Sequence, residues 1–349
     1  MSLSRPVKFP LLKLPWLCIE CVLHNSDKFI LIYFATISNR TRRIVKNSKY
    51  PLKDIDIHLN GSKQINFGDQ KAWRFTRQMY IGSVSLVLQR NSFPLRTRKC
   101  FESWIGPYLQ SCTTGDTLVA LKMGVEFMID VFGCAIETVF INGNKPLEFL
   151  GLGIRTVEKL FINKAEQVET AYQPKKVNIK DLKYLLENVQ VTDRCVFNAP
   201  IPEDFYCEPH IFKCRRLSFM YENSADWVTL DVLCQFGVPQ LNFWCHRFSK
   251  QDLVSYVTRW FNSENRKLEY FFVSFNDSIS LGDFKIDHLN PMPFCEKRRN
   301  RCPFAEGWKN TDISSGKDIL RQDGLLATFF VEPTSVFFYI WHKRFPDTV

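Results

Sequence analysis

The stretch Phe9-Pro-Leu-Leu-Lys-Leu-Pro15, with the short segments that follow it up to Lys49, decides the fold of the N-terminal part of the chain. Pro15 suits the first turn of a helix, where its missing N–H would have no partner in any case. In the helix predicted over residues 16–23, Ile19, Val22 and Leu23 recur at i, i+3 and i+4. This spacing predicts one apolar stripe along the helix.

Two more helical segments follow within the first fifty residues. Residues 29–34 are all apolar, so this segment is either buried on every side or, as we expect, shared between its own core and a partner. Ser38 can cap a third, basic helix over residues 40–49, of which only Ile44 and Val45 would face inward. Chains below ~40 residues rarely bury enough apolar surface to be stable alone. The three helices are therefore expected to need a partner.

The order of Leu-Pro, helix, apolar helix, Ser38-Asn-Arg-Thr41 turn and basic helix resembles the F-box. More narrowly, it is similar to nematode F-box proteins that carry a type-2 F-box-associated region. The resemblance implies an F-box at residues 1–49 that binds a Skp-family adaptor and, through it, a cullin. A plain helical subdomain is the alternative that the apolar pattern alone would favour. The adaptor-binding residues implied by the resemblance are Leu11, Leu14, Pro15, Ile19, Val22, Leu23, Ile30 and Leu31.

Composition and charge set the wider limits. A length of 349 residues predicts about two domains, and 45% hydrophobic residues with 31 Phe are ample for a core. The net charge of +10 permits nonspecific attraction to nucleic acid. The cations occur in clusters beside expected turns and helix ends, which favours solvated surfaces over nucleic-acid contact.

Residues 118–141 form the best candidate for a membrane span, but they contain Lys122, Glu126, Asp130 and Glu137. The first three charges recur every four residues and mark the wet face of a soluble amphipathic helix. The dry face is expected to carry Leu118, Leu121, Val125, Met128, Ile129 and Phe132. With no secretory signal recognised, the chain is expected in the cytoplasm or nucleus, with its twelve cysteines reduced.

One cysteine cluster invites a metal interpretation. Cys207, His210 and Cys214, with Cys245-His246 further on, supply only part of a zinc pattern, which usually has paired ligands in both halves. The chain is therefore expected to fold without a metal or other cofactor.

Beyond residue 50 the pattern becomes mixed. Alternating apolar residues on both sides of Asn60-Gly61 predict a β-hairpin. Further strands are predicted at residues 84–88, 100–104, 138–142, 157–162, 194–198, 217–221, 241–245 and 268–275. Helices are predicted at residues 118–132, 181–188, 227–236 and 250–261. This alternation predicts an α+β chain in which the helical module precedes a degenerate leucine-rich-repeat-like α/β domain with antiparallel strands at its ends; an ordinary α/β domain is the alternative.

The resemblance extends through this second region, which it makes an F-box-associated substrate-recognition region over residues 50–349. It is most recognisable at about residues 207–275, through Leu241-Asn-Phe-Trp-Cys245 and the helix that begins at Lys250. Near the C-terminus, Asp323-Gly324 and Glu332-Pro333 predict the turns of an antiparallel meander.

No nucleophile elbow, zinc-protease motif or phosphate-binding loop occurs in the sequence, so a noncatalytic protein is expected. The resemblance implies a substrate-recognition subunit of a cullin-based ubiquitin ligase, with an unknown protein target. The alternatives are a noncatalytic solenoid interaction protein and, less favoured, a nucleic-acid-binding protein. Aromatic residues crowd the strands between residues 217 and 275, and alternation predicts that some of them form either a second buried face or a target-binding surface.

Overall fold

The computed structural model describes residues 11–50, 52, 54–61, 63–67, 72–77, 95–102, 106–164, 177–244, 246–294 and 312–342. The chain forms two compact units, residues 1–137 and 138–349. The predicted boundary between residues 49 and 50 stays a prediction, because the N-terminal helices belong to the same compact unit as the strands that follow them. The predicted strand at residues 84–88 lies outside the described residues.

Three short helices open the first unit, α1 (Trp16–His24), α2 (Lys28–Ile37) and α3 (Asn39–Asn47), after a 3-10 turn, η1 (Leu11–Lys13). Pro15 occupies the N-cap position of α1, one residue before the predicted place. Ser38 caps α3 as predicted, because its hydroxyl accepts from the Thr41 amide while the Thr41 hydroxyl accepts from the Ser38 amide.

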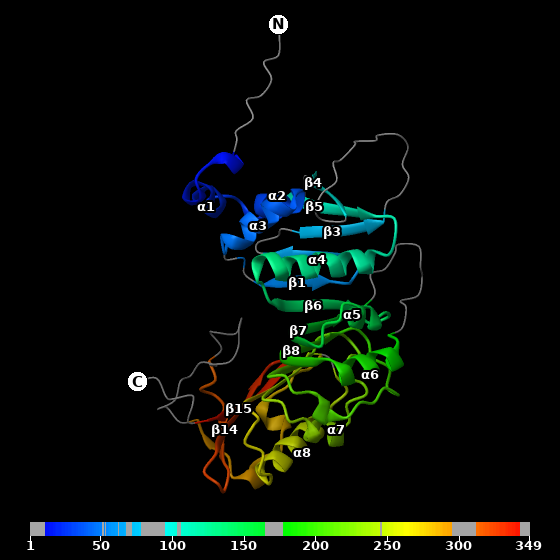
Figure 1. Ribbon diagram of the computed structural model, residues 1–349. Helices are drawn as coiled ribbons and strands as arrows, with labels where there is room; N and C mark the ends of the chain where they lie inside the picture. The colour runs from blue at the N-terminus through cyan, green and yellow to red at the C-terminus, as the bar shows by residue number, and fades with distance from the viewer. Residues whose placement is uncertain are drawn as a thin grey trace. The chain divides into compact units, whose positions relative to one another are not determined.

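The rest of the first unit is a five-stranded sheet in the order β1-β2-β3-β5-β4, crossed by the long helix α4 (Thr117–Phe132) (Figure 1). The strands are β1 (Ile55–His58), β2 (Lys63–Phe67), β3 (Ala72–Arg77), β4 (Arg96–Glu102) and β5 (Gly106–Thr113). The predicted hairpin is confirmed: β1 and β2 are antiparallel, and Gly61 in their turn has a φ of 57°, which glycine adopts without strain.

Helix α4 supports both the sheet and α3. Its apolar face includes Leu121, Val125 and Met128, all buried, whereas Ile129 is 44% exposed and its predicted place on the dry face was wrong. Asp130, on the wet face, accepts hydrogen bonds from Arg42 at 2.6 Å and Lys46 at 2.7 Å, and these lower the pKa of its carboxyl. The basic helix α3 therefore contacts α4 of its own chain.

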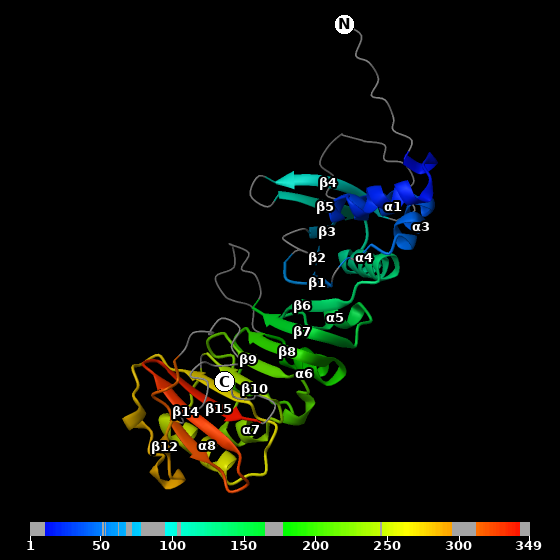
Figure 2. The ribbon, with the colours of Figure 1, turned by 90° about the vertical axis from the view of Figure 1, so that its left-hand side faces the viewer.

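The second unit contains six parallel strands that lie in the sheet in chain order, β6-β7-β8-β9-β10-β11. They are β6 (Ile136–Asn142), β7 (Thr156–Asn163), β8 (Gln190–Asn198), β9 (Arg216–Phe219), β10 (Gln240–Phe243) and β11 (Tyr270–Ser274). The connections carry α5 (Leu147–Gly151), α6 (Ile179–Asn188), α7 (Leu230–Gln235) and α8 (Lys250–Phe261), and Figure 2 shows α5, α6 and α7 on one side of the strands. Helix α7 is shorter than predicted, because Trp227 lies in a turn before it.

An antiparallel meander completes this sheet. The strands β12 (Met292–Pro293), β13 (Lys317–Leu320), β14 (Leu326–Glu332) and β15 (Ser335–Trp341) pair in chain order, and β15 also pairs with β11. Gly324 has a φ of 82° in the predicted β13–β14 turn. The architecture is thus mixed α/β, with antiparallel strands beside a parallel core. The leucine-rich-repeat-like description stays a prediction.

The main core of the second unit lies between the parallel strands and the helices. Phe197, Phe219, Phe243 and Phe271 are fully buried on this face. Their rings follow one another across neighbouring strands, and Tyr256 of α8 packs on Phe271 with ring centroids 4.4 Å apart. Aromatic pairs of this kind stabilise a core beyond simple area burial. None of the helices described is both long enough and apolar enough to cross a membrane.

Candidate functional site

Helix α1 presents an apolar face to solvent. Leu17 is 76% exposed and Val22 40% exposed, and Cys18 and Cys21 lie exposed between them. Positions 17, 18, 21 and 22 recur at helical spacing and form one side of the helix. Ile19 and Leu23 point the other way and are buried, so the predicted stripe of Ile19, Val22 and Leu23 is divided between core and surface.

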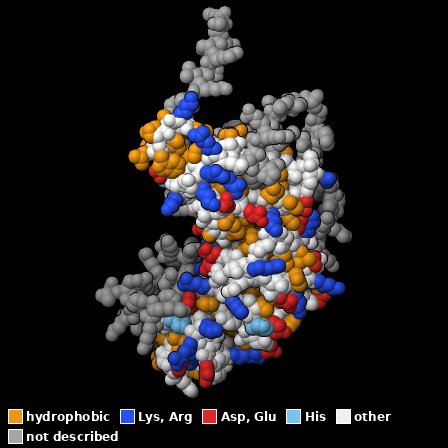
Figure 3. Space-filling model, viewed as in Figure 1, with side chains coloured by type: hydrophobic (Ala, Val, Ile, Leu, Met, Phe, Trp, Pro, Cys, Tyr) orange, Lys and Arg blue, Asp and Glu red, His pale blue; other side chains and the backbone are white. Residues whose placement is uncertain are grey.

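Helix α2 adds a second exposed stripe. Ile30 is 47% and Ile37 40% exposed, and the half-buried Phe34 lies between them at i+4. On the other side of this helix, Phe29, Leu31 and Ile32 are buried. Hydrophobic side chains gather over the N-terminal helices in the space-filling view (Figure 3). We name the exposed apolar side chains of α1 and α2 together the helical apolar surface. They are Leu17, Cys18, Cys21, Val22, Ile30 and Ile37.

This surface rests on a fixed support. Arg40 of α3 donates to the Leu12 carbonyl at 3.0 Å, which holds η1 against α3. Arg42 places its guanidinium 5.0 Å from the ring centre of Phe127 in α4 while it bonds Asp130. Helices α1 and α2 pack inward through other residues, Ile19 and Leu23 of α1 and Phe29, Leu31 and Ile32 of α2, so their packing does not use the exposed apolar side chains.

The sequence-predicted adaptor-binding residues divide into three groups. Three are buried in the unit itself, namely Ile19, Leu23 and Leu31. Two are half-buried, Leu11 and Leu14, and three are exposed, Pro15, Val22 and Ile30. Sequence reasoning missed Leu17, Cys18, Cys21 and Ile37, although the spacing of residues 17, 18, 21 and 22 could have indicated a second apolar face.

The aromatic strands of the second unit do not form an open surface. On the face away from the helices, Tyr270 and Phe272 pack with Phe337 and Tyr339 in a second cluster of buried residues. Of the two alternatives, a second buried face therefore describes Tyr270 and Phe272, whereas Tyr221 and Trp244 are half-buried, and target recognition by this region stays a prediction. The meander extends the sheet beyond β11, and its strand β15 contributes Phe337 and Tyr339 to this second cluster.

The cysteines of the zinc-like cluster are core residues. Burial raises the pKa of Cys207 and of Cys214 to about 12, and Cys195 beside them is also fully buried. His210 of the cluster is exposed, and Cys245 lies outside the described residues. Within the described ranges, no group of three or more His, Cys, Asp or Glu residues is arranged to hold a metal ion.

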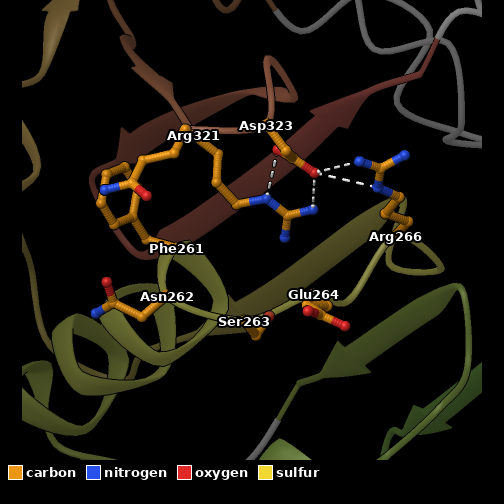
Figure 4. A pocket seen from close by; sticks show the side chains of 8 residues that line it. Phe261, Asn262, Ser263, Glu264, Arg266, Arg321 and Asp323 are labelled. Carbon is orange, nitrogen blue, oxygen red and sulfur yellow. Dashed lines mark hydrogen bonds and ion pairs between the residues drawn. The ribbon is translucent and has the colours of Figure 1, made fainter.

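A cavity of about 550 Å³ lies where the turn after β13 meets the end of α8 (Figure 4). Its polar centre is Arg321, which is 3% exposed and makes two hydrogen bonds to Asp323, at 2.9 and 2.8 Å. The same guanidinium donates to the carbonyls of Asn265 and Trp260 and lies over the Trp260 ring. Because its charge and donors are used inside the protein, Arg321 holds the meander to α8.

The stretch of the second unit from η2 (Pro209–Ile211) through β11 coincides with a family match. Residues 209–273 match a protein-family model described as F-box associated. This region belongs to the F-box-associated family. The family resemblance inferred from the sequence is thereby confirmed, and the matched residues agree with the predicted span of 207–275.

The chain also resembles two proteins of the nematode Caenorhabditis elegans. It is 30% identical to the uncharacterized protein F59B2.8 over 177 residues, which are 47% of this chain and 40% of that protein. It is 26% identical to the uncharacterized protein F59B2.9 over 141 residues, which are 38% of this chain and 32% of that protein. The chain thus covers less than half the length of each relative. No solved structure matches it.

Proposed function

We propose that this chain is the substrate-recognition subunit of a cullin-based, SCF-type ubiquitin ligase. In this proposal the N-terminal helices bind a Skp-family adaptor, and through it a cullin, while the F-box-associated region binds a target protein. The chain itself would be noncatalytic and would act in the cytoplasm or nucleus. Holding a target beside the ubiquitin-transferring subunits raises its effective local concentration.

The observation that carries the proposal is the helical apolar surface. Of the thirteen large hydrophobic residues that are exposed in the described part of the chain, five lie between Trp16 and Ile37. Such a concentration on one short segment is typical of a protein interface. The surface also lies in the segment that resembles an F-box, well before the family match in the chain. These two facts support a docking role for the helices.

The test replaces the exposed face of α1 without touching its buried side. A Leu17→Asp, Val22→Asp double variant should lose binding to a purified Skp-family adaptor by at least about thirtyfold, since truncating interface hot spots costs ~2 kcal/mol or more. The matched control is Val119→Asp with Leu147→Asp, which alters two exposed apolar residues on other helices. It should bind the adaptor like the unaltered chain.

Binding should be measured by biolayer interferometry with the full chain, with circular dichroism as a check of folding. If the α1 variant folds and binds the adaptor as well as the control does, the proposed docking surface is wrong. If the unaltered chain binds no Skp-family adaptor, the ligase role itself fails and a noncatalytic interaction protein without a ligase link becomes the better description.

A further inference from the structure

Three cationic side chains lie in one row on the face of the parallel sheet that the helices leave uncovered. Lys159 of β7 is in register with Arg194 of β8, and Arg194 with Arg216 of β9. Thr138 and Gln240 end the row on either side. Neighbouring strands are about 4.8 Å apart, so the three cations span roughly 10 Å. We name Lys159, Arg194 and Arg216 the cationic row.

A local irregularity in the sheet creates this row. Val157 of β7 pairs with Val191 of β8. The next pair given by the register is Lys159 with Arg194, which is two residues further along β7 but three residues further along β8, so β8 contains one extra residue. Without that bulge, Asp193 would lie opposite Lys159. Bulges re-aim side chains, often beside functional sites. Here the bulge replaces an expected Asp–Lys pair by two adjacent cations.

Like charges directly opposite each other on neighbouring strands are destabilising. The row itself contains no carboxylate between its cations, since its members are Thr, Lys, Arg, Arg and Gln. Arg216 donates to the neutral Gln240 amide oxygen at 2.8 Å. Nearby, Lys159 lies 3.9 Å from Glu158, whose carboxylate is beside the row. The row is thus an array of three cations in register on neighbouring strands, with no acidic residue among its five members.

An apolar pair lies beside the row. Phe140 follows Thr138 by two residues in β6, and Phe161 follows Lys159 by two residues in β7. Because residues two apart lie on the same face of a strand, this pair lies on the face of the row, about 7 Å further along the strands. Their rings stack with centroids 4.8 Å apart and both are half-buried. A cavity of about 450 Å³ is lined by this pair, the cationic row and Arg215. Four cations line it against two carboxylates, those of Glu158 and Asp193, and the buried Glu269 pairs with Arg215 at 3.7 Å, so the site keeps an excess of positive charge.

The geometry points to this cavity as a binding site for an acidic peptide segment of a partner protein, with its carboxylates on the cationic row and an adjacent apolar side chain on Phe140 and Phe161. Arginine matches carboxylates in a bidentate fork. A span of roughly 10 Å accommodates two or three carboxylates of an extended peptide. Nucleic acid fits less well, because its affinity comes from many phosphates along a longer groove. The inference rests on the proposed function only in identifying the partner as a ligase target.

The probe is a fluorescein-labelled peptide of alternating Glu and Leu, and its matched control has Gln at each Glu position. Fluorescence polarisation with the full chain should show binding of the Glu peptide that weakens as salt is raised, because exposed charges are screened. The Gln peptide should bind at least tenfold more weakly. Equal binding of the two peptides overturns the inference.

The residue test neutralises two members of the row. Lys159→Gln with Arg216→Gln should weaken binding of the Glu peptide at least tenfold. Lys180→Gln with Lys285→Gln removes the same charge from exposed positions outside the cavity and should leave binding unchanged. Lys159→Arg keeps the charge and should retain binding, which provides a readout if the double variant fails to fold. Equal losses in the two double variants would mean nonspecific attraction and would overturn the proposal.

Two further measurements separate this inference from its alternatives. A labelled single-stranded oligonucleotide that binds more tightly than the peptide, with the same dependence on the row, would assign the cavity to nucleic acid and overturn the proposal. Adaptor binding is measured in parallel and should be unaffected by the row variants. A chain that binds the Glu peptide but no adaptor would retain this inference while the ligase role fails, and the reverse result would retain only the ligase role.

Discussion

Replacing Arg321 tests whether one buried guanidinium holds the C-terminal meander to the rest of the second unit. Arg321 is 3% exposed and uses its donors on the Asp323 carboxylate and on the carbonyls of Asn265 and Trp260. An Arg321→Met change keeps the apolar contact but leaves a carboxylate and two carbonyls without this donor. Removing one partner of a buried pair costs about 3–5 kcal/mol.

We expect the lower end of that range, about 3 kcal/mol, because Asp323 is 28% exposed and water can solvate part of its charge. For a unit of this size, 1 kcal/mol shifts the melting temperature by about 2–4 °C. Arg321→Met should therefore lower the melting temperature by roughly 6–12 °C. Arg321→Lys should recover little, since an ammonium cannot reproduce the two-pronged contact with the carboxylate.

The chain supplies a matched control in Arg266, which contacts the same Asp323 oxygen at 3.0 Å but is 70% exposed (Figure 4). Exposed ion pairs contribute about 0–1 kcal/mol, so Arg266→Met should shift the melting temperature by a few degrees at most. The melting temperatures of the two variants are measured by thermal unfolding, with near-ultraviolet circular dichroism as the signal. Equal shifts for the two variants, or a shift below about 2 °C for Arg321→Met, would refute the reasoning.

The pH dependence of the same variant gives an independent check. Hydrogen bonding to Arg321 holds the pKa of the Asp323 carboxyl well below its usual range. A carboxyl with a depressed native pKa contributes stability that is present above its unfolded pKa and is lost as the pH falls towards the native value. The difference between the unaltered chain and Arg321→Met should accordingly be constant from pH 5 to 8 and shrink below about pH 4.

Three further predictions concern the rest of the fold. Gly124→Ala should destabilise the first unit by about 1–3 kcal/mol, because a Cβ there would lie 2.2 Å from the Phe75 ring; urea unfolding measures the loss. Burial lowers the pKa of His246 to about 4. Between about pH 6.5 and pH 4, His246 is therefore protonated in the unfolded chain but neutral in the native state. His246 alone should therefore lower the stability by roughly 2 kcal/mol between pH 7 and pH 5, measured as the difference in urea midpoints between the unaltered chain and His246→Gln. Purified chain should contain well under one zinc per molecule by elemental analysis, and a chelator should leave its melting temperature unchanged.

Each of these three predictions has its own control. Gly115→Ala should be nearly neutral, because a Cβ there makes only an ordinary contact at 3.7 Å. His246→Gln should show a smaller loss at pH 5 than the unaltered chain, and an equal loss would assign the pH dependence to other groups. A stoichiometric zinc that disappears on mutating Cys207 would overturn the description of the cysteine cluster as core.

Local signals in the sequence predicted the secondary structure well where the residues act through their own backbone. Ser38 as a helix cap, Gly61 in a hairpin and Gly324 in the β13–β14 turn all have the predicted role, because capping and left-handed φ depend on neighbouring residues alone. Residues whose position depends on distant elements were predicted less well. Ile129 is exposed in spite of its apolar side chain, and Val22 lies apart from the buried Ile19 and Leu23.

The same distinction explains why the helical apolar surface was partly predictable. Helical spacing identified α1 as amphipathic, but it could not tell which of two apolar faces would pack against the rest of the unit. The outcome depends on residues far along the chain, such as Ser48 after α3, whose carbonyl oxygen lies 3.2 Å from Nε2 of His24 at the end of α1. A contact of that kind leaves no periodic signal in either helix.

The cationic row could not be predicted from the periodicity of the sequence. Strict alternation along residues 190–198 puts Val191 and Asp193 on one face, and counting from Val157 then pairs Lys159 with Asp193 as a cross-strand ion pair. The register observed is Lys159 with Arg194, since the bulge adds one residue to β8 and moves every later side chain of that strand to the other face. One inserted residue thus buries Cys195 and Phe197 in the core and sets Arg194 between two other cations. Because the register is decided by packing across the whole sheet, the charge of this surface becomes visible only once the strands are paired.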